Sequence, residues 1–302
     1  VSVVFMCMVG LKVLIVTLSL ASTASRRDAV TCKPVSKQRL VHFRFQVLME
    51  VFMEAGVPAG VINLIFVPGS TAGDVILSHP DFAGIHFTGS TSVFQDIWKT
   101  IGNNIHQYKT YPRIVGETGG KDFIMVHKSA NAAEVATAMS RGAFEFQGQK
   151  CSAASRAYVP SNIWDEVKSI YCQQVNSFKV GVPSDTSNFV NAVIDERAFD
   201  KIAGFIDYVK TQNDAEIITG GNYDKSNGYF IEPTTVVTTN PKFRTMCEEI
   251  FGPVLTIYVY PENEFEQTLK LLDETSEYAL TGSIISNDRY AINVATKALE
   301  NA

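Results

Sequence analysis

The stretch IHFTGSTSVFQDIWKTIGNNI, residues 85–105, combines a short apolar run, a glycine turn and a helical pattern. A strand is expected over residues 85–88, a turn at Gly89 and Ser90, and a helix over about 92–105. Just upstream, residues 61–67 form another apolar run that is short enough for a buried strand. Strands that alternate with helices are typical of a parallel sheet, whose ligands bind at the carboxyl ends of the strands.

The same alternation extends in both directions along the chain. Upstream, a helical pattern covers residues 40–54 and is stopped by Gly56 and Pro58, and a short helical piece ends near Ser78. Downstream, further strands are expected at residues 113–116, 123–126, 157–159, 234–237, 255–260 and 283–286. We therefore expect an α/β fold built on parallel sheets.

The clearest helix begins at Asn131, a favourable N-cap residue, with Glu134 three positions later as in a capping box. It is expected to end at Gly148. Its apolar stripe consists of Val135, Ala138, Met139 and Phe146.

The composition indicates a globular protein of about two domains, because the chain has 302 residues and 46% of them are hydrophobic. The formal net charge is −5, so there is no basic field to attract nucleic acid or anionic lipid. The five cysteines are widely spaced and lack a C-x-x-C pair, which indicates a reducing compartment without disulfides or a zinc site. The five histidines lack metal-ligand spacing, and no metal is expected.

Residues 1–20 are strongly apolar and have several explanations. Lys12 in the middle of a membrane-spanning helix would cost roughly 2.5 to 3.5 kcal/mol, so a signal peptide with its core at residues 13–21 is the better membrane-type explanation. Arg26 and Arg27 nevertheless follow that core instead of preceding it. The alternatives are a buried strand pair or sequence foreign to the functional protein. Because the chain starts at Val1 and not at methionine, we expect its natural N-terminus to lie upstream.

The motif GQKCSA, residues 148–153, places Cys151 just beyond the amphipathic helix and at the expected start of the next element. A helix N-terminus and the neighbouring Lys150 would both favour the thiolate, which is the nucleophilic form of cysteine. The motif alone is equally compatible with an inert buried cysteine.

Three other motifs carry candidate binding or catalytic groups. In GETGGKDF, residues 116–123, Glu117 follows a strand and precedes two glycines. It is interpreted either as a base at a cleft or as a solvated turn residue. FTGSTS, residues 87–92, offers a phosphate the free N–H groups of a helix start, although the chain has no G-x-G-x-x-G motif. EEIFGPV, residues 248–254, supplies a carboxylate for a ribose diol, or is an ordinary charged loop.

Together and in this order, the four motifs resemble those of the aldehyde dehydrogenase superfamily. The stretches FEFQGQKCSAASRAYVP, residues 144–160, and GYFIEPT, residues 228–234, resemble its branch of 1-pyrroline-5-carboxylate dehydrogenases, which oxidise L-glutamate gamma-semialdehyde. The resemblance runs from about residue 54 to residue 302. It implies NAD as cofactor, an aldehyde substrate, conversion of proline to glutamate in the mitochondrial matrix, and a homo-oligomer.

The resemblance also implies roles for individual residues. Cys151 matches the cysteine that adds to the aldehyde carbon, and Glu117 matches the glutamate that activates water to hydrolyse the thioester, which gives a free acid and not a coenzyme A ester. Ser152 is expected to face the substrate. The residues expected to contact NAD are Lys33 at the adenosine ribose, Gly89, Ser90, Thr91, Ser92 and Val93 at the pyrophosphate, Glu249 at the nicotinamide ribose and Phe251 beside the ring.

The chain departs from the family at both ends. The family's oxyanion-hole asparagine lies upstream of the position of Lys33, where residues 1–20 offer no counterpart, and loss of one such donor costs about 10² to 10³ in rate. The chain also stops before the family's substrate-anchoring loop and oligomerisation strand. We expect residues 1–30 to be unlike the family, residues 31–116 to be part of an NAD-binding domain, and residues 117–302 to be a catalytic domain without its C-terminal part.

Other functions stay open from the sequence. One is an aldehyde dehydrogenase for another class of aldehyde, since the substrate-anchoring loop is absent. Another is a truncated, non-catalytic homologue that keeps the fold to bind NAD or a partner subunit. A membrane-anchored protein is a third, and it depends wholly on residues 1–20.

Overall fold

A computed structural model describes residues 2–9, 12–18, 37–67 and 69–300, and the chain divides into two compact units. Unit 1 ends at Gly119 and unit 2 begins at Gly120. The sequence-based division after residue 116 lies close to this boundary. Each unit has its own sheet and its own core, so each is described by itself.

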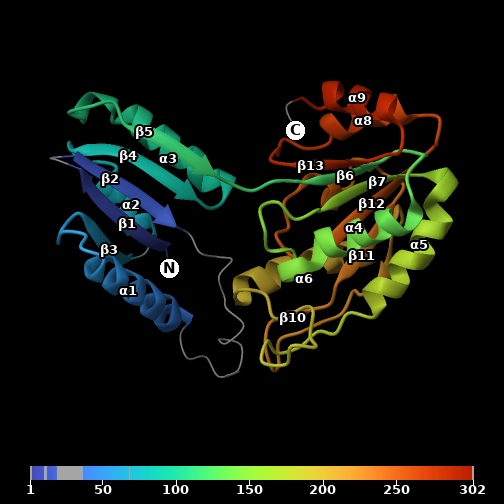
Figure 1. The fold of residues 1–302 in the computed structure, drawn as a ribbon, viewed down its shortest axis with the longest axis horizontal. Helices are drawn as coiled ribbons and strands as arrows, with labels where there is room; N and C mark the ends of the chain where they lie inside the picture. Colours follow the sequence, from blue (N-terminus) through green and yellow to red (C-terminus); the bar gives the residue numbers. More distant parts are fainter. Residues whose placement is uncertain (1, 10–11, 19–36, 68, 301–302) are drawn as a thin grey trace. The chain divides into compact units, whose positions relative to one another are not determined.

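The sheet of unit 1 has five strands in the order β3-β1-β2-β4-β5 (Figure 1). The strands are β1 (Ser2–Val9), β2 (Lys12–Leu18), β3 (Ile62–Val67), β4 (Phe82–Thr88) and β5 (Arg113–Glu117). Strands β2, β4 and β5 run parallel, whereas β1 is antiparallel to both of its neighbours. The parallel core expected from the strand–helix alternation is confirmed, and β1 adds an antiparallel part that the alternation did not indicate.

The helices of unit 1 are α1 (Lys37–Glu54), α2 (Gly69–Ile76), α3 (Thr91–Asn103) and the 3-10 turn η2 (Ile105–Gln107). The expected strand–turn–helix at residues 85–105 is therefore confirmed as β4, Ser90 as N-cap, and α3. Apolar side chains from α2, β4, α3 and the segment after α2 form the core, which contains Ala72, Leu77, Phe82, Ile85, Phe87 and Ile101.

The apolar N-terminal segment pairs with the rest of this sheet. The backbone of β1 is hydrogen-bonded to β3, and that of β2 to β4, as the strand-pair explanation requires. The remainder of the proposed signal-peptide core, residues 19–21, lies outside the described residues. Where the structure describes the chain, none of its helices combines the length and the apolar character needed to cross a membrane.

The sheet of unit 2 has six strands in the order β13-β6-β7-β12-β11-β8. Neighbouring strands are parallel except at β8, which runs antiparallel to β11 at one edge. The strands are β6 (Phe123–Val126), β7 (Arg156–Pro160), β8 (Ala215–Thr219), β11 (Thr234–Thr238), β12 (Val254–Tyr260) and β13 (Gly282–Ile285). A separate small hairpin is formed by β9 (Tyr223–Asp224) and β10 (Phe230–Ile231).

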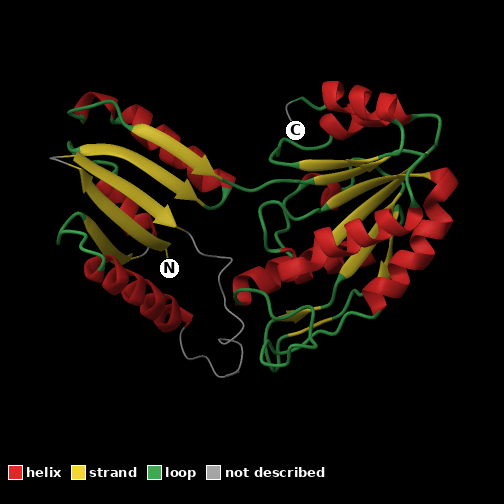
Figure 2. Ribbon diagram, viewed as in Figure 1, coloured by secondary structure: helices red, strands yellow, loops and turns green. Residues whose placement is uncertain are grey.

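Helices cover both faces of this sheet (Figure 2). One core packs the sheet against α4 (Ala132–Phe144) and α5 (Ser161–Asn176). The other core packs it against α6 (Glu196–Lys210), α8 (Phe265–Asp273) and α9 (Arg289–Ala298). Successive side chains of a strand point to opposite faces, so β7 places Ala157 and Val159 in the first core and Tyr158 in the second.

The helix expected from Asn131 to Gly148 is partly confirmed. The Asn131 side chain accepts hydrogen bonds from the backbone N–H groups of Ala133 and Glu134, as an N-cap does. The helix ends at Phe144, however, and Phe146 lies in a separate 3-10 turn, η3 (Glu145–Gly148), with a positive φ of 55°. The expected place of Phe146 on the helix stripe was therefore wrong, because the backbone changes handedness before it.

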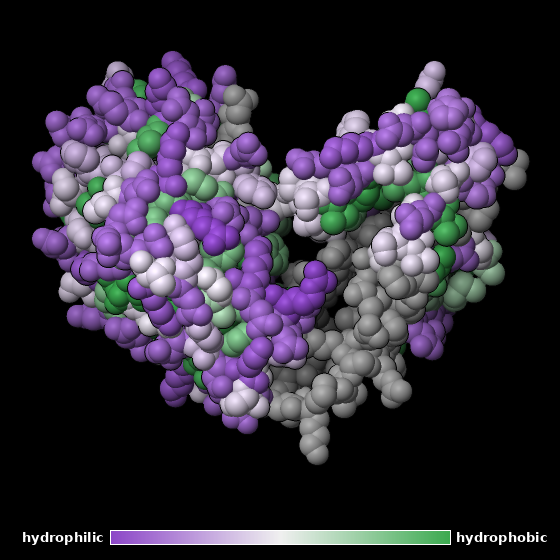
Figure 3. Space-filling model, turned by 180° about the vertical axis from the view of Figure 1, so that it is seen from behind, coloured by the Kyte–Doolittle hydropathy of each residue, from purple (hydrophilic) through white to green (hydrophobic). Residues whose placement is uncertain are grey.

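The two units differ in the large apolar side chains that they expose. Most of these side chains belong to unit 1, among them Val51, Trp98, Tyr111 and Val115. The face of unit 2 seen in Figure 3 is mostly hydrophilic, with apolar residues scattered over it. Scattered exposed apolar residues are normal for a folded protein and identify no binding surface in unit 2.

Candidate active site

Cys151 lies in a turn between η3 and β7, and its side chain is exposed. The turn is closed by a hydrogen bond of 3.1 Å from the Ala153 N–H to the Lys150 carbonyl. No helix begins at Cys151, so the expected helix N-terminus there was wrong. The Lys150 ammonium forms an ion pair with Glu145 instead, at 2.6 Å. Exposure excludes the inert buried cysteine, and the thiol is open to reaction.

The backbone just before Cys151 is held in an unfavourable conformation. Phe146, Gln147 and Gly148 have φ values of 55°, 59° and 62°, in the left-handed region. Each non-glycine residue in that region costs about 1 to 2 kcal/mol. No other residue fits at position 148 without a shift of the backbone, because a Cβ added to Gly148 would lie 2.3 Å from the Gly252 carbonyl oxygen. This close approach packs the Cys151 segment against the segment that contains Glu249.

The Glu249 carboxylate lies beside the backbone that precedes the buried lysine of the GETGGKDF motif. Its Oε1 accepts a hydrogen bond of 3.1 Å from the Gly120 N–H. A Cβ on Gly120 would lie 3.0 Å from the Cys151 carbonyl oxygen, so this glycine permits a close approach of three segments. A small pocket here is lined by residues that include Gly120, Lys150, Ser155, Glu249 and Phe251.

The surroundings of the Glu249 carboxyl shift its pKa in opposite directions. Burial raises the pKa of this carboxyl, and the hydrogen bond from Gly120 and the positive charges of Lys201 and Lys121 act in the opposite direction. The Lys201 ammonium also donates a hydrogen bond of 2.7 Å to the Glu249 carbonyl. The next aromatic residue, Phe251, has a positive φ of 58°, which marks a tight turn before Gly252. Glu249 is thus fixed through both its backbone and its side chain.

Three charged residues are buried next to this site: Lys121, Asp122 and Arg156 are each 3% exposed or less. Burial lowers the pKa of Lys121 to about 7 and raises that of Asp122 to about 6. Among the described residues, the Lys121 Nζ and one Asp122 oxygen have no hydrogen-bond partner. Arg156, by contrast, donates to the carbonyls of Lys121 and Leu272 at 2.8 and 3.0 Å.

Asp122 connects several segments of unit 2. Its side chain accepts a hydrogen bond of 2.8 Å from the Thr281 N–H, and its carbonyl accepts bonds from the N–H groups of Ser155 and Arg156. Asp122 therefore joins the end of the Cys151 loop to the loop before β13. A buried charge is costly unless it is paired, so the cluster of Lys121, Asp122 and Arg156 lowers the free energy of unfolding.

The remaining candidate residues lie in unit 1. Glu117 ends β5 with an exposed side chain, and its carbonyl accepts a hydrogen bond of 3.0 Å from the Gly89 N–H. Gly89 and Ser90 connect β4 to α3, and the N-cap Ser90 makes no side-chain cap hydrogen bond. The buried hydroxyl of Thr91 also has no hydrogen-bond partner in the part of the chain that the structure describes. The first turn of α3 therefore keeps N–H donors free for an anion.

The structure thus groups the sequence-derived candidates by unit. In unit 2 it brings the segment of Cys151 and Ser152 close to that of Glu249 and Phe251; in unit 1 it brings Glu117 close to the Gly89 turn. Lys33 lies outside the described residues. Within those residues, no group of three histidine, cysteine, aspartate or glutamate side chains is arranged to hold a metal.

Sequence reasoning did not identify several residues that shape this site. Gly120 and Asp122 stand inside the quoted GETGGKDF motif, where the paired glycines were the available signal. Gln149 stands inside GQKCSA, but its role depends on a partner far along the chain. Lys201 lies on an amphipathic helix in the sequence with nothing to distinguish it from a surface lysine.

This arrangement belongs to a known family. The sequence profile of the aldehyde dehydrogenase family matches residues 13–302, and the chain is a member of that family. The match begins inside residues 1–30, the segment that we expected to be unlike the family.

Two relatives and one solved structure show which enzymes the chain is similar to. The chain is 49% identical over 277 residues to the mitochondrial delta-1-pyrroline-5-carboxylate dehydrogenase of Dictyostelium discoideum, and 46% identical over 254 residues to that of Danio rerio. These alignments cover 91% and 84% of this chain but 49% and 46% of the relatives. The Mycobacterium tuberculosis delta-pyrroline-5-carboxylate dehydrogenase bound with NAD superposes with a TM-score of 0.79 at 43% identity, over 84% of this chain and 46% of that one. The chain therefore spans about half the length of the proteins that it matches.

Proposed function

We propose that this chain carries the reactive cysteine and part of the cofactor site of an NAD-dependent dehydrogenase that oxidises L-glutamate gamma-semialdehyde to L-glutamate, the last step of proline breakdown. The observation that carries the proposal is the exposed Cys151, whose turn packs against the Gly120–Glu249 contact in a chain of this family. The proposed substrate is supported by the relatives, which are delta-1-pyrroline-5-carboxylate dehydrogenases. The word mitochondrial in those names supports a place in the mitochondrial matrix.

Cys151 and Glu117 carry the chemistry in this proposal. The Cys151 thiolate adds to the aldehyde carbon and forms a thiohemiacetal. Loss of a hydride from that carbon leaves a thioester on Cys151, and NAD, when bound, supplies the hydride acceptor. Glu117 takes a proton from water, which attacks the thioester carbonyl and releases the carboxylic acid and the free thiolate. Ser152, next to the nucleophile, faces the substrate.

Each unit by itself offers groups of the kind that contact part of a dinucleotide. Free N–H groups at the start of α3, with Gly89, Ser90, Thr91, Ser92 and Val93, would hold the pyrophosphate, since a helix start favours an anion. The unpartnered Thr91 hydroxyl offers one more polar contact. In unit 2, Glu249 would accept hydrogen bonds from the nicotinamide ribose, with Phe251 beside the ring. Lys33 would contact the adenosine ribose.

Turnover with site variants tests the proposal. The protein is mixed with the semialdehyde and NAD, and NADH is followed by its absorbance. Cys151→Ser should abolish NADH formation, whereas Cys172→Ser, a change at a cysteine of α5, should retain it. Glu117→Gln should release about one equivalent of NADH and then accumulate an acyl group on Cys151, visible by mass spectrometry. No NADH from the parent, or equal activity of Cys151→Ser, would contradict the proposal.

Two further measurements separate the alternatives. A kcat/KM for simple aliphatic aldehydes above that for the semialdehyde would indicate another substrate class. Iodoacetamide should label the exposed Cys151 before Cys172 and Cys247, because burial raises the pKa of both of those thiols. A Cys151 no more reactive than Cys172 would indicate a non-catalytic homologue.

A further inference from the structure

The strained segment before Cys151 needs external contacts to hold it. Phe146 and Gln147 have left-handed backbone conformations that non-glycine residues avoid, and such conformations persist only where surrounding contacts fix them. The hydrogen bond from the Gln149 N–H to the Phe146 carbonyl, at 3.1 Å, lies within the segment itself. The backbone hydrogen bonds of the described residues include none that joins residues 146–149 to another part of unit 2, so the hydrogen bonds that do so come from side chains.

Two glutamine side chains make those contacts. Gln149 is 3% exposed, and its Oε1 accepts a hydrogen bond of 2.8 Å from the Ile194 N–H. Gln147 is 5% exposed, and in the orientation that satisfies its amide the carbonyl oxygen accepts a bond of 2.7 Å from the Asn191 N–H. Both partners belong to one short segment, residues 191–194. The two side chains thus form a pair of anchors, which we call the glutamine clamp.

The segment 191–194 is itself firmly held. The Val193 N–H donates a hydrogen bond of 2.8 Å to the Tyr229 carbonyl, and Asp195, the next residue after the segment, caps α6 through the Ala198 N–H at 2.9 Å. The clamp therefore attaches the Cys151 loop to the start of α6.

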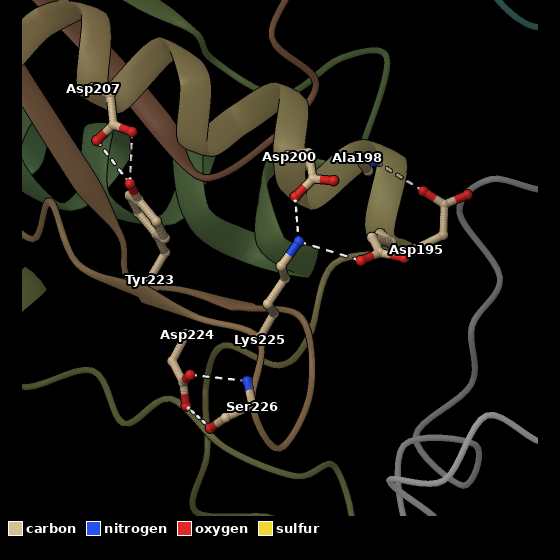
Figure 4. Close-up of polar contacts among 9 residues, drawn as sticks. Asp195, Ala198, Asp200, Asp207, Tyr223, Asp224, Lys225 and Ser226 are labelled. Carbon is tan, nitrogen blue, oxygen red and sulfur yellow. Dashed lines mark hydrogen bonds and ion pairs between the residues drawn. The ribbon is translucent and has the colours of Figure 1, made fainter.

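Helix α6 is fixed in turn by the β9–β10 hairpin. Figure 4 shows Lys225 reaching Asp200, at 2.9 Å, and the Tyr223 hydroxyl reaching the Asp207 carboxylate, at 2.7 Å. These exposed contacts are individually weak, but they join two turns of the helix to one hairpin. Helix α6 also carries Lys201, which donates to the Glu249 carbonyl. One helix therefore fixes both the loop of Cys151 and the backbone of Glu249.

We propose that Gln147 and Gln149 are positioning residues, whose amides hold the strained backbone that places Cys151 relative to Glu249. The effect on turnover rests on the proposed function, whereas the effect on the loop does not. A nucleophile displaced by about 1 Å can lose about a hundredfold in rate, so fixing this backbone has a direct consequence for catalysis.

Three variants test the glutamine clamp. Gln149→Met keeps the volume of the side chain but removes the acceptor for the Ile194 N–H, whereas Gln149→Glu keeps an acceptor oxygen. Gln174→Met is the matched control, because Gln174 also makes two side-chain hydrogen bonds, to Ser140 and Thr137, without touching the loop. Amide hydrogen exchange is measured at Ile194 and over residues 145–154, together with the thermal midpoint.

In Gln149→Met, exchange at both places should rise roughly tenfold or more, because the half-buried Ile194 N–H loses its acceptor. Exchange should return to within about threefold of the parent in Gln149→Glu and stay unchanged in Gln174→Met. If the parent forms NADH, Gln149→Met should lower kcat by at least tenfold and leave the KM for NAD within about threefold. Unchanged exchange in Gln149→Met, or equal loosening in Gln174→Met, would overturn the proposal. A parent that forms no NADH would refute the proposed function alone, and hydrogen exchange would still decide on the glutamine clamp.

Discussion

Replacing Lys121 by methionine should stabilise unit 2 near neutral pH. The lysine is 1% exposed and its Nζ has no hydrogen-bond partner, and burial lowers its pKa from 10.5 to about 7. Between pH 7 and 10.5 the unfolded chain therefore holds a proton at Lys121 that the folded chain does not hold. The free energy of unfolding of the parent rises with pH through that window, and falls as pH falls towards 7.

The size of the effect follows from that difference. A pKa difference of about 3.5, from 10.5 to about 7, corresponds to about 5 kcal/mol at about 1.4 kcal/mol per pH unit. Lys121→Met removes the titratable amine and keeps most of the apolar part of the side chain. The variant should therefore be more stable than the parent at pH 7 by up to about 5 kcal/mol. The gap should close as the pH approaches 10.5. Urea unfolding at a series of pH values measures it.

A matched lysine provides the control. Lys270→Met alters a side chain that is 78% exposed on α8, so its free energy of unfolding should change by less than about 0.5 kcal/mol at every pH. A difference between Lys121→Met and the parent that does not vary with pH would refute the reasoning, as would a destabilised variant at pH 7. Either result would mean that the lysine is charged and paired in the folded protein.

Three other changes in unit 2 have defined outcomes. Asp122→Asn keeps the acceptor for the Thr281 N–H and removes a carboxyl whose pKa is raised from 3.8 to about 6. The free energy of unfolding of the parent, compared with that of the variant, therefore falls as the pH rises from 3.8 through 6. The variant should exceed the parent by up to about 3 kcal/mol in urea unfolding at pH 7.5 and by nothing at pH 3.5; the opposite trend would contradict this. Gly148→Ala should lose more than about 3 kcal/mol by urea unfolding, because its Cβ meets the Gly252 carbonyl at a positive φ; parent-like stability would show that this backbone can relax. Arg156→Met leaves the buried Lys121 carbonyl without its donor, while the Leu272 carbonyl keeps a bond from the Thr275 N–H, so the change should cost about 1 to 3 kcal/mol in the same assay; a neutral result would mean that water replaces the guanidinium.

The sequence predicted the regular part of the fold because its signals are local. The apolar run and the glycine turn before α3 are adjacent in the chain, and so are Asn131 and the two N–H groups that it caps. The antiparallel pairing of β1 with β3 and of β8 with β11 joins segments that are not adjacent in the chain, which no local pattern encodes. The end of α4 was misplaced because Phe146 continues the apolar spacing while its backbone is left-handed.

The candidate site was predictable as a set of motifs but not as a geometry. Cys151 and Glu249 were identified from their motifs, and unit 2 brings their segments together through Gly120 and Gly148. The electrostatic argument for Cys151 failed because it assumed a helix that does not begin there. Lys201, which fixes Glu249, could not be found from sequence, since its contact spans 48 residues.

The left-handed run before Cys151 limits which sequences this loop can accept. Position 146 must supply a left-handed backbone, and position 147 must supply the same backbone together with the amide of the glutamine clamp. Glycine, asparagine and aspartate visit that region readily, whereas isoleucine, valine and threonine are excluded by the branching at Cβ. A library randomised at Phe146 should therefore be depleted of β-branched residues after selection for folded protein. The position of Cys151 thus depends on a backbone conformation that most L-amino acids avoid.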